Sequence, residues 1–188
     1  MGVLTSDHPK CMTEISYKNT ILSRQLRLLA AYGVEEVVMT TGYYDKVLVD
    51  YCEFLHLPIK FTFVNNPVYD KTNYIYSIYC AKEQLKDDDI VLMHGDLVFE
   101  PLVLEGVLGS ETSCMTVSST LPLPEKDFKA VIKGDRIEKV GISSSTTQWR
   151  HSLSIKSRKM TGSYGWRTSR SSARPTIANA TPKTPSTR

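Results

Sequence analysis

One short polar segment carries side chains of the types that bind phosphates and metal ions. His94-Gly95-Asp96 follows a run of four apolar residues, and a carboxylate such as Asp96 can hold a magnesium ion that bridges phosphate groups. Gly95 lets a ligand approach the backbone closely. The alternative for Gly95-Asp96 is a simple turn. His94 is better explained as a packed histidine, because no second histidine lies at metal-ligand spacing.

Lys10 and the loop over residues 65–73 supply the other candidate ligands. A lysine contacts phosphate as a point charge, although an exposed lysine is often only solvated surface. The loop contains Tyr69, Thr72 and Asn73 ahead of a segment with helical spacing. Thr72 or Asn73 could cap that helix. Its N-terminus would also offer backbone N–H groups to an anion or a nucleotide base.

The elements that must position these residues alternate between helical and strand patterns. Apolar residues recur at helical spacing over residues 20–32, 44–55 and 73–86, and β-rich runs occupy residues 36–41, 59–65, 90–93 and 113–118. Residues 128–133 and 136–142 flank Gly134-Asp135 as in a β-hairpin. This order predicts an α/β fold, a three-layer Rossmann-like domain with a mainly parallel sheet.

Ligands bind beyond the carboxyl ends of the strands in such a sheet. This rule selects Thr41 and Gly42 after one strand, the loop over residues 65–73 after the next, and Gly95-Asp96 after the third. We therefore expect one site at this edge of the sheet.

The composition is that of an ordinary globular chain of 188 residues, with 41% hydrophobic and 23% charged residues. No apolar run is long enough to span a membrane, and the first residues lack the apolar segment of a secretory signal. Four widely spaced cysteines fit reduced thiols better than a zinc site or a disulfide framework. We therefore expect a cytoplasmic protein with no membrane partner.

Charge divides the chain after about residue 142. Residues 143–188 contain nine Lys or Arg and no Asp or Glu, so the remaining 14 basic and 20 acidic residues give residues 1–142 a net charge of −6. The last 46 residues are rich in Ser and Thr and poor in large aliphatic residues. We predict a domain over residues 1–142 and a disordered basic tail over residues 143–188.

Five motifs in order resemble the sugar-nucleotide type of nucleotidyltransferases, and most closely the phosphocholine cytidylyltransferases of bacteria and archaea. They are LTxxxPKCMxEI, RQLxxLxxxGVEEVV, TGY, NNPxYxxTN and DDDIVLMHGDLVFE, and the resemblance covers about residues 3–142. The resemblance implies transfer of CMP from CTP to phosphocholine or a similar small phosphate ester, with Mg²⁺ and release of pyrophosphate.

The matching positions imply roles for individual residues. Lys10 matches the lysine that contacts phosphate, and Asp96 matches the metal carboxylate. Tyr69, Thr72 and Asn73 match the loop near the nucleotide base and the acceptor. A sugar-1-phosphate nucleotidyltransferase and an inactive truncated relative are the alternatives.

Two departures from the family pattern lead to further expectations. The family begins with a strand and a G-x-G-x-R-L loop that holds the triphosphate, and this chain begins where that loop would end. We therefore expect a truncated domain that lacks its first strand and binds CTP weakly or not at all.

The tail is the second departure. Moving its reading frame back by one nucleotide, with free codon choice, permits a family-like continuation that begins EFFDDAVETFPLYK. We therefore expect an out-of-frame tail. The alternative is an evolved basic arm for nucleic acid, a partner that the acidic domain itself does not favour. The acceptor, the base and the oligomeric state stay open.

Overall fold

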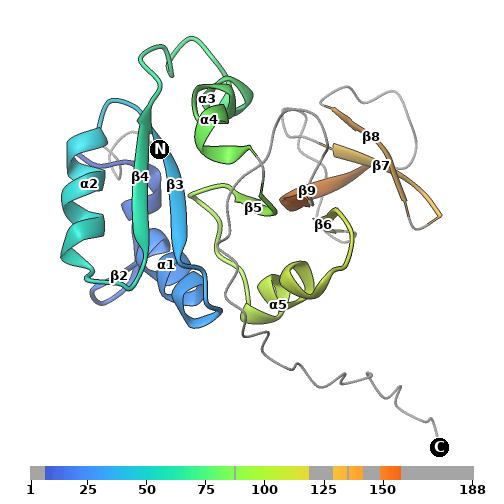
Figure 1. Cartoon of the computed structure of the whole chain (residues 1–188), viewed down its shortest axis with the longest axis horizontal. Coiled ribbons are helices and arrows are strands. Elements are labelled where there is room, and N and C mark those ends of the chain that lie inside the picture. The colour runs from blue at the N-terminus through green and yellow to red at the C-terminus, as the bar shows by residue number, and fades with distance from the viewer. Residues whose placement is uncertain (1–6, 87, 119–128, 135, 142–148, 158–188) are drawn as a thin grey trace, which may run out of the picture.

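The computed structural model describes residues 7–86, 88–118, 129–134, 136–141 and 149–157. Its strands form three separate sheets (Figure 1). A short hairpin pairs β1 (Glu14–Ser16) with β2 (Asn19–Thr20). The second sheet pairs β3 (Glu36–Thr41) in parallel with β4 (Lys60–Asn65). The third is antiparallel and contains β5 (Ile90–Met93), β6 (Cys114–Ser118), β7 (Lys129–Lys133), β8 (Arg136–Gly141) and β9 (Trp149–Ser157).

Two helices pack against the β3–β4 pair in one apolar core (Figure 1). They are α1 (Ile21–Ala31) and α2 (Asp45–Phe54). The α1 helix begins at a capping box, in which Thr20 Oγ1 accepts from Ser23 N–H at 3.0 Å and Ser23 Oγ accepts from Thr20 N–H at 2.9 Å. It ends before Gly33, whose φ of +76° suits a residue without a side chain. The buried apolar residues of this core are Leu22, Leu26, Leu29, Val34, Leu48, Cys52, Ile59 and Leu104.

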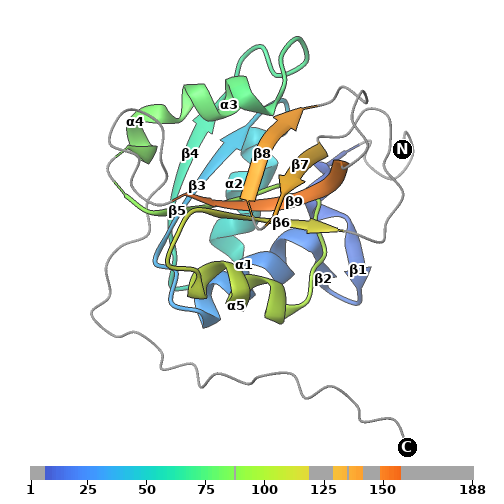
Figure 2. The same cartoon turned by 90° about the vertical axis from the view of Figure 1, so that its right-hand side faces the viewer.

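The remaining helices lie at opposite ends of the sheets (Figure 2). Helices α3 (Tyr74–Cys80) and α4 (Lys82–Leu85) lie at one end, and α5 (Pro101–Gly109) lies at the other. A single turn of 3₁₀-helix, η1 (Lys10–Met12), precedes β1. No helix in the described part of the chain is long and apolar enough to cross a membrane.

The α/β fold class and every helix and strand predicted from residues 20–142 are confirmed, with small differences at their ends. The helix predicted over residues 73–86 is divided into α3 and α4 at the buried Ala81. The sheet predicted to be mainly parallel is parallel only in β3–β4 among the described strands. The α5 helix was not predicted, because its sequence PLVLEGVLG is apolar on all sides and contains two glycines.

The strand β9 corrects part of the prediction for residues 143–188. It pairs with β5, β6 and β7, so the predicted disorder does not hold for Trp149–Ser157. Its sequence alternates Trp149, His151, Leu153 and Ile155 with polar residues, which is a strand pattern that the overall composition of the tail concealed. The other residues of the predicted tail lie outside the described residues, and the frameshift stays a prediction.

Candidate active site

The carboxyl ends of β3, β4 and β5 meet near the first turn of α3. Thr41 lies opposite Asn65 at the paired ends of β3 and β4. The ring of Tyr74, at the start of α3, contacts the imidazole of His94 edge to face, with 4.9 Å between ring centroids. The segments after β3 and β4 therefore lie at one end of the molecule (Figure 1), and the contact of His94 with Tyr74 joins the segment after β5 to the start of α3.

Lys10 reaches the same end through a close contact of η1 with the turn after β5. A Cβ atom added at Gly95 would lie 3.3 Å from Cys11 Cβ, so the two backbones approach tightly here. Both Lys10 and Asp96 are exposed. The fold thus brings the predicted phosphate-binding lysine and the predicted metal carboxylate, 86 positions apart in sequence, to neighbouring segments with both charged side chains exposed.

Gly42 is held beneath the ring of Tyr69. A Cβ atom added at Gly42 would lie 2.8 Å from Tyr69 Cγ, which is closer than real contacts allow. Tyr69 is 47% exposed, so its outer side remains open to a ligand. Thr41 is buried, and its Oγ1 lies 3.4 Å from Asn65 Nδ2. Thr41 therefore supports the turn, whereas Gly42 and Tyr69 form its surface.

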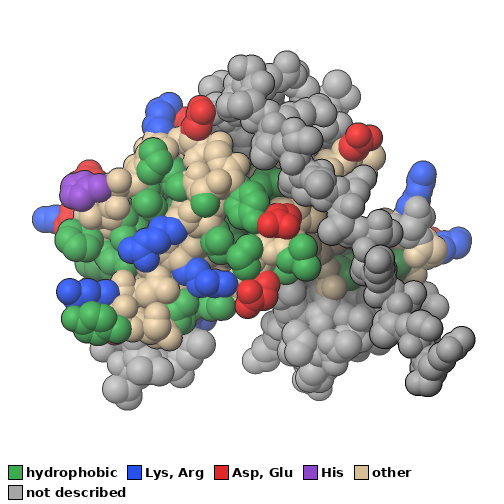
Figure 3. Space-filling model, turned by 90° about the horizontal axis from the view of Figure 1, so that it is seen from below, with side chains coloured by type: hydrophobic (Ala, Val, Ile, Leu, Met, Phe, Trp, Pro, Cys, Tyr) green, Lys and Arg blue, Asp and Glu red, His purple; other side chains and the backbone are tan. Residues whose placement is uncertain are grey.

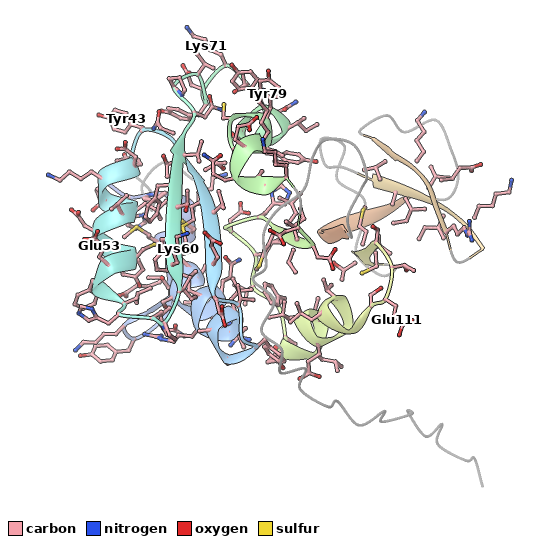
Figure 4. All side chains as sticks on the ribbon, viewed as in Figure 1. Tyr43, Glu53, Lys60, Lys71, Tyr79 and Glu111 are labelled. Atoms are coloured by element: carbon pink, nitrogen blue, oxygen red, sulfur yellow. The ribbon has the colours of Figure 1, made fainter. Side chains whose placement is uncertain are left out.

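The sequence left open whether Thr72 or Asn73 caps the helix, and in the structure the two side chains have different roles. Asn73 caps α3, because its Oδ1 accepts from Ile75 N–H at 3.0 Å. Thr72 holds the loop together, because its Oγ1 donates to Val68 O at 2.8 Å. Lys71 of this loop lies at the same end of the molecule as Tyr43 and Tyr79 (Figure 4).

Asn66 organises the same loop and was not predicted as a functional residue. It is fully buried, and its Nδ2 donates to Thr72 Oγ1 and to Ser77 Oγ, both at 3.0 Å. Its Oδ1 accepts from Val68 N–H at 3.0 Å. The pair Asn65-Asn66 before a proline was the available signal, because an asparagine side chain commonly bonds to the backbone two residues later.

Gln25, also missed, holds the turn that carries Asp96. It lies on α1, is 5% exposed, and its Nε2 donates to His94 O at 3.0 Å and to Leu97 O at 2.8 Å. The two acceptors lie on either side of Asp96. The neighbouring Arg24 donates to Phe99 O at 2.9 Å, so α1 holds this loop at three backbone oxygens.

Residues 1–118 match the MobA-like NTP transferase domain family. The chain belongs to this family. Among curated relatives, the chain is 34% identical over 123 residues to the CMP-5′-(3-aminopropyl)phosphonate synthase of Streptomyces rubellomurinus. The matched region covers 65% of this chain and 19% of that protein. The chain is also 33% identical over 102 residues to the CTP:phosphoglutamine cytidylyltransferase of Campylobacter jejuni, and this match covers 51% of this chain and 38% of the relative. The chain thus spans less than half the length of either protein.

A solved structure shows the same fold in an NTP transferase. The inositol-1-phosphate CTP transferase of T. maritima superposes with a TM-score of 0.67 at 22% identity, over 84% of this chain and 65% of that one. The NTP transferase domain family and the fold predicted from the sequence are therefore confirmed. The roles of the individual site residues stay predictions.

Removing the Gln25 side-chain amide should loosen the Asp96 turn of this NTP transferase domain. Gln25→Met keeps the length of the side chain but leaves the carbonyl groups of His94 and Leu97 without this donor, which costs on the order of 1–3 kcal/mol for a buried group. We expect faster amide hydrogen exchange at residues 94–97 and a lower urea midpoint. Arg24→Met is the matched control: it should destabilise the segment near Phe99 and leave exchange at Asp96 unchanged. Equal effects of both changes at Asp96 would contradict a specific role for Gln25.

Two thiols beside the site are held protonated. Burial raises the pKa of Cys11 to about 11, with a further rise from the charge of Asp96, and burial raises the pKa of Cys52 to about 12. The ordinary value is 9.0, so the folded state favours the protonated thiols. Each contribution to stability is therefore complete below pH 9 and is lost as the pH rises toward the folded-state pKa, about 11 for Cys11 and about 12 for Cys52.

This protonation predicts slow alkylation. A pKa of about 11 in place of 9.0 lowers the thiolate fraction of Cys11 about 100-fold at pH 8, and the thiolate is the nucleophile. We expect Cys11 to react with iodoacetamide at least about 100-fold more slowly in the folded chain than in urea, as followed by mass spectrometry of tryptic peptides. Equal rates in the two conditions would show that Cys11 is not protected.

Proposed function

We propose that this domain transfers CMP from CTP to a small phosphate ester or phosphonate and releases pyrophosphate. The observation that carries this function is the close contact between Cys11 and Gly95, which brings the segments of the exposed residues Lys10 and Asp96 together. The names of the two curated relatives, a CMP-phosphonate synthase and a CTP-dependent cytidylyltransferase, support CTP as the nucleotide.

The site also fits Mg²⁺. In the described part of the chain no group of three or more His, Cys, Asp or Glu could enclose a metal ion. Mg²⁺ commonly takes only one or two carboxylates and completes its coordination shell with water and substrate phosphates. The exposed carboxylate of Asp96 is a ligand of this type. When bound there, Mg²⁺ would offset negative charge on the phosphates.

The residues would act by positioning the reactants. An oxygen of the acceptor's phosphate or phosphonate attacks the α-phosphorus of CTP, the bond from the α-phosphorus to the bridging oxygen breaks, and pyrophosphate carries away the electron pair. Lys10 would hold a phosphate group through its ammonium. Gly42, Tyr69 and Asn73 would form the surface on which the base and the acceptor lie. Most of the rate enhancement in such a site comes from orientation and fixed charge.

The test is pyrophosphate release, with Mg²⁺ and a matrix of nucleotides and acceptors, by the protein expressed from its complete reading frame. CTP is compared with UTP and dTTP. The acceptors are phosphocholine, phosphoglutamine, 3-aminopropylphosphonate, inositol 1-phosphate and glucose 1-phosphate. We expect release with CTP and one of the first four compounds. Preference for UTP or dTTP with glucose 1-phosphate would favour a sugar-1-phosphate nucleotidyltransferase. No release with any pair, together with no CTP binding by calorimetry, would contradict the proposed function.

A further inference from the structure

A pair of aromatic rings joins two segments of the candidate active site. Tyr74 is the first residue of α3 and follows Asn73, whereas His94 follows β5 and lies two positions before Asp96. Their ring centroids are 4.9 Å apart and the ring planes are inclined at 65°, which is a favourable edge-to-face arrangement. The α3 helix itself lies against β3 and β4. The ring pair thus links the loop after β4 to the turn after β5.

The Tyr74 side of this pair is held in place by its neighbours. Asn73 caps α3, because its Oδ1 accepts from Ile75 N–H at 3.0 Å. The buried Asn66 donates to Ser77 Oγ at 3.0 Å, which attaches α3 to the start of the loop. Tyr74 lies between these two attachments in sequence and is half-buried. Its ring is therefore a fixed surface against which another side chain can be positioned.

On the other side, the turn after β5 is held through its backbone. Gln25 Nε2 donates to His94 O at 3.0 Å, and Gly95 lies tightly against Cys11. Neither contact involves the imidazole of His94, whereas the ring of Tyr74 contacts it directly. The ring pair therefore adds a side-chain restraint from a third element, α3, to a turn that α1 and η1 already hold.

We propose that the contact between Tyr74 and His94 positions Asp96 relative to the loop over residues 65–73. The inference rests on the proposed function, in which Asp96 holds Mg²⁺ and this loop lies against the base and the acceptor. Tyr74 and His94 are positioning residues, because they act through Asp96 and the loop and not on a reacting atom. Transfer requires the attacking oxygen and the α-phosphorus to be aligned, and this alignment is lost when one part of the site shifts against the other.

The kinetic test uses the protein expressed from its complete reading frame, with CTP, Mg²⁺ and the one of the five acceptors that gives the highest rate with the wild type. Tyr74→Leu removes the ring and keeps an apolar side chain. We expect the Mg²⁺ concentration for half-maximal rate to rise about fivefold and kcat to fall about threefold, which together match the contribution of an aromatic pair. The KM for CTP should stay within about twofold of wild type, because the cap and the loop are intact.

Two variants control for the ring and for the helix. Tyr74→Phe keeps the ring contact and should behave as the wild type does. Tyr79→Leu removes another ring of α3, which lies against Tyr76 with 6.0 Å between the centroids, and should leave the Mg²⁺ dependence and kcat unchanged. A fall in kcat alone for Tyr74→Leu, or equal changes in the Tyr79 variant, would mean that the ring only stabilises α3 and would overturn the proposal.

A double-mutant cycle tests whether the two rings act as one unit. His94→Leu should reproduce the effects of Tyr74→Leu, and the variant with both substitutions should lose no more than either alone, because the pair is already broken. His94 is exposed, so His94→Leu compared with His94→Phe decides if Tyr74→Leu does not fold. Effects of the two substitutions that multiply would overturn the proposal. An active wild type with unchanged kinetics in Tyr74→Leu would contradict this inference alone, whereas a wild type that releases no pyrophosphate would contradict the proposed function and this inference with it.

Discussion

Replacing Asp96 with asparagine is expected to lower the rate of pyrophosphate release from CTP by about two to three orders of magnitude. Asparagine has nearly the same size and keeps one oxygen, so the turn after β5 should retain its shape. It lacks the negative charge that holds a divalent cation against the phosphates, and loss of such fixed charge stabilisation commonly costs about 10²–10³-fold in rate. The apparent Mg²⁺ concentration for half-maximal rate should rise.

The measurement is initial rate against Mg²⁺ concentration at saturating CTP and acceptor. Asp50→Asn is the matched control, because Asp50 is an exposed carboxylate on α2. It should change neither the rate nor the Mg²⁺ dependence. A rate for the Asp96 variant within about twofold of wild type would remove Asp96 from the proposed machinery. A parallel loss in the Asp50 variant would point to a general effect of surface charge.

Asn66→Leu should be the most destabilising single change in the loop. Leucine has a similar size but leaves Val68 N–H, Thr72 Oγ1 and Ser77 Oγ without the amide they contact. Unsatisfied buried groups cost on the order of 1–3 kcal/mol each, and partial rearrangement should reduce the sum to about 3 kcal/mol in the free energy of unfolding. The loop over residues 66–73 should also become a preferred site of proteolysis.

Urea denaturation gives the free energy, and limited proteolysis with mass spectrometry locates the change. Asn65→Leu is the control one position earlier, since Asn65 is exposed and its two contacts are both 3.4 Å long. It should lower stability by less than about 0.5 kcal/mol. Similar losses in the two variants would mean that the Asn66 network does not hold the loop.

The sequence permitted accurate prediction where local pattern and burial agree. The uninterrupted apolar run of β5 predicted a strand, and the apolar spacing of α1 predicted a helix. Both elements lie where the pattern indicated. The rule for strand ends predicted that Gly42, Asn73 and Asp96 lie at one edge. The structure pairs the ends of β3 and β4 and places His94, which follows β5, against Tyr74 at the start of α3.

The missed features depend on contacts between distant segments. Gln25 looks like one more polar position of an amphipathic helix, and only the folded chain brings its amide to two carbonyl groups about 70 residues later. The β9 strand pairs with partners more than 30 positions away in most of its contacts. Neither the hydrogen bonds of Gln25 nor the partners of β9 can be recognised from the local sequence.

The distribution of charge on the surface also depends on the folded chain and could not be predicted from the sequence. Basic and acidic side chains are interspersed among apolar ones on the face seen in Figure 3, so the described residues of that face do not form an area of one sign. The excess of basic residues falls after residue 142, and most of that segment lies outside the described residues. The net charge of the chain therefore says little about the face that its domain presents to a partner.

The attachment of α1 to the loop after β5 has a consequence for how this domain can evolve. Leu22, Leu26 and Leu29 anchor α1 in the core, while Arg24 and Gln25 of the same helix hold the backbone around Asp96. A substitution that repacks the interior also shifts this support. Selection for heat tolerance and selection for turnover will thus act on the same few positions, and suppressors of a damaged Asp96 turn should arise on the buried face of α1.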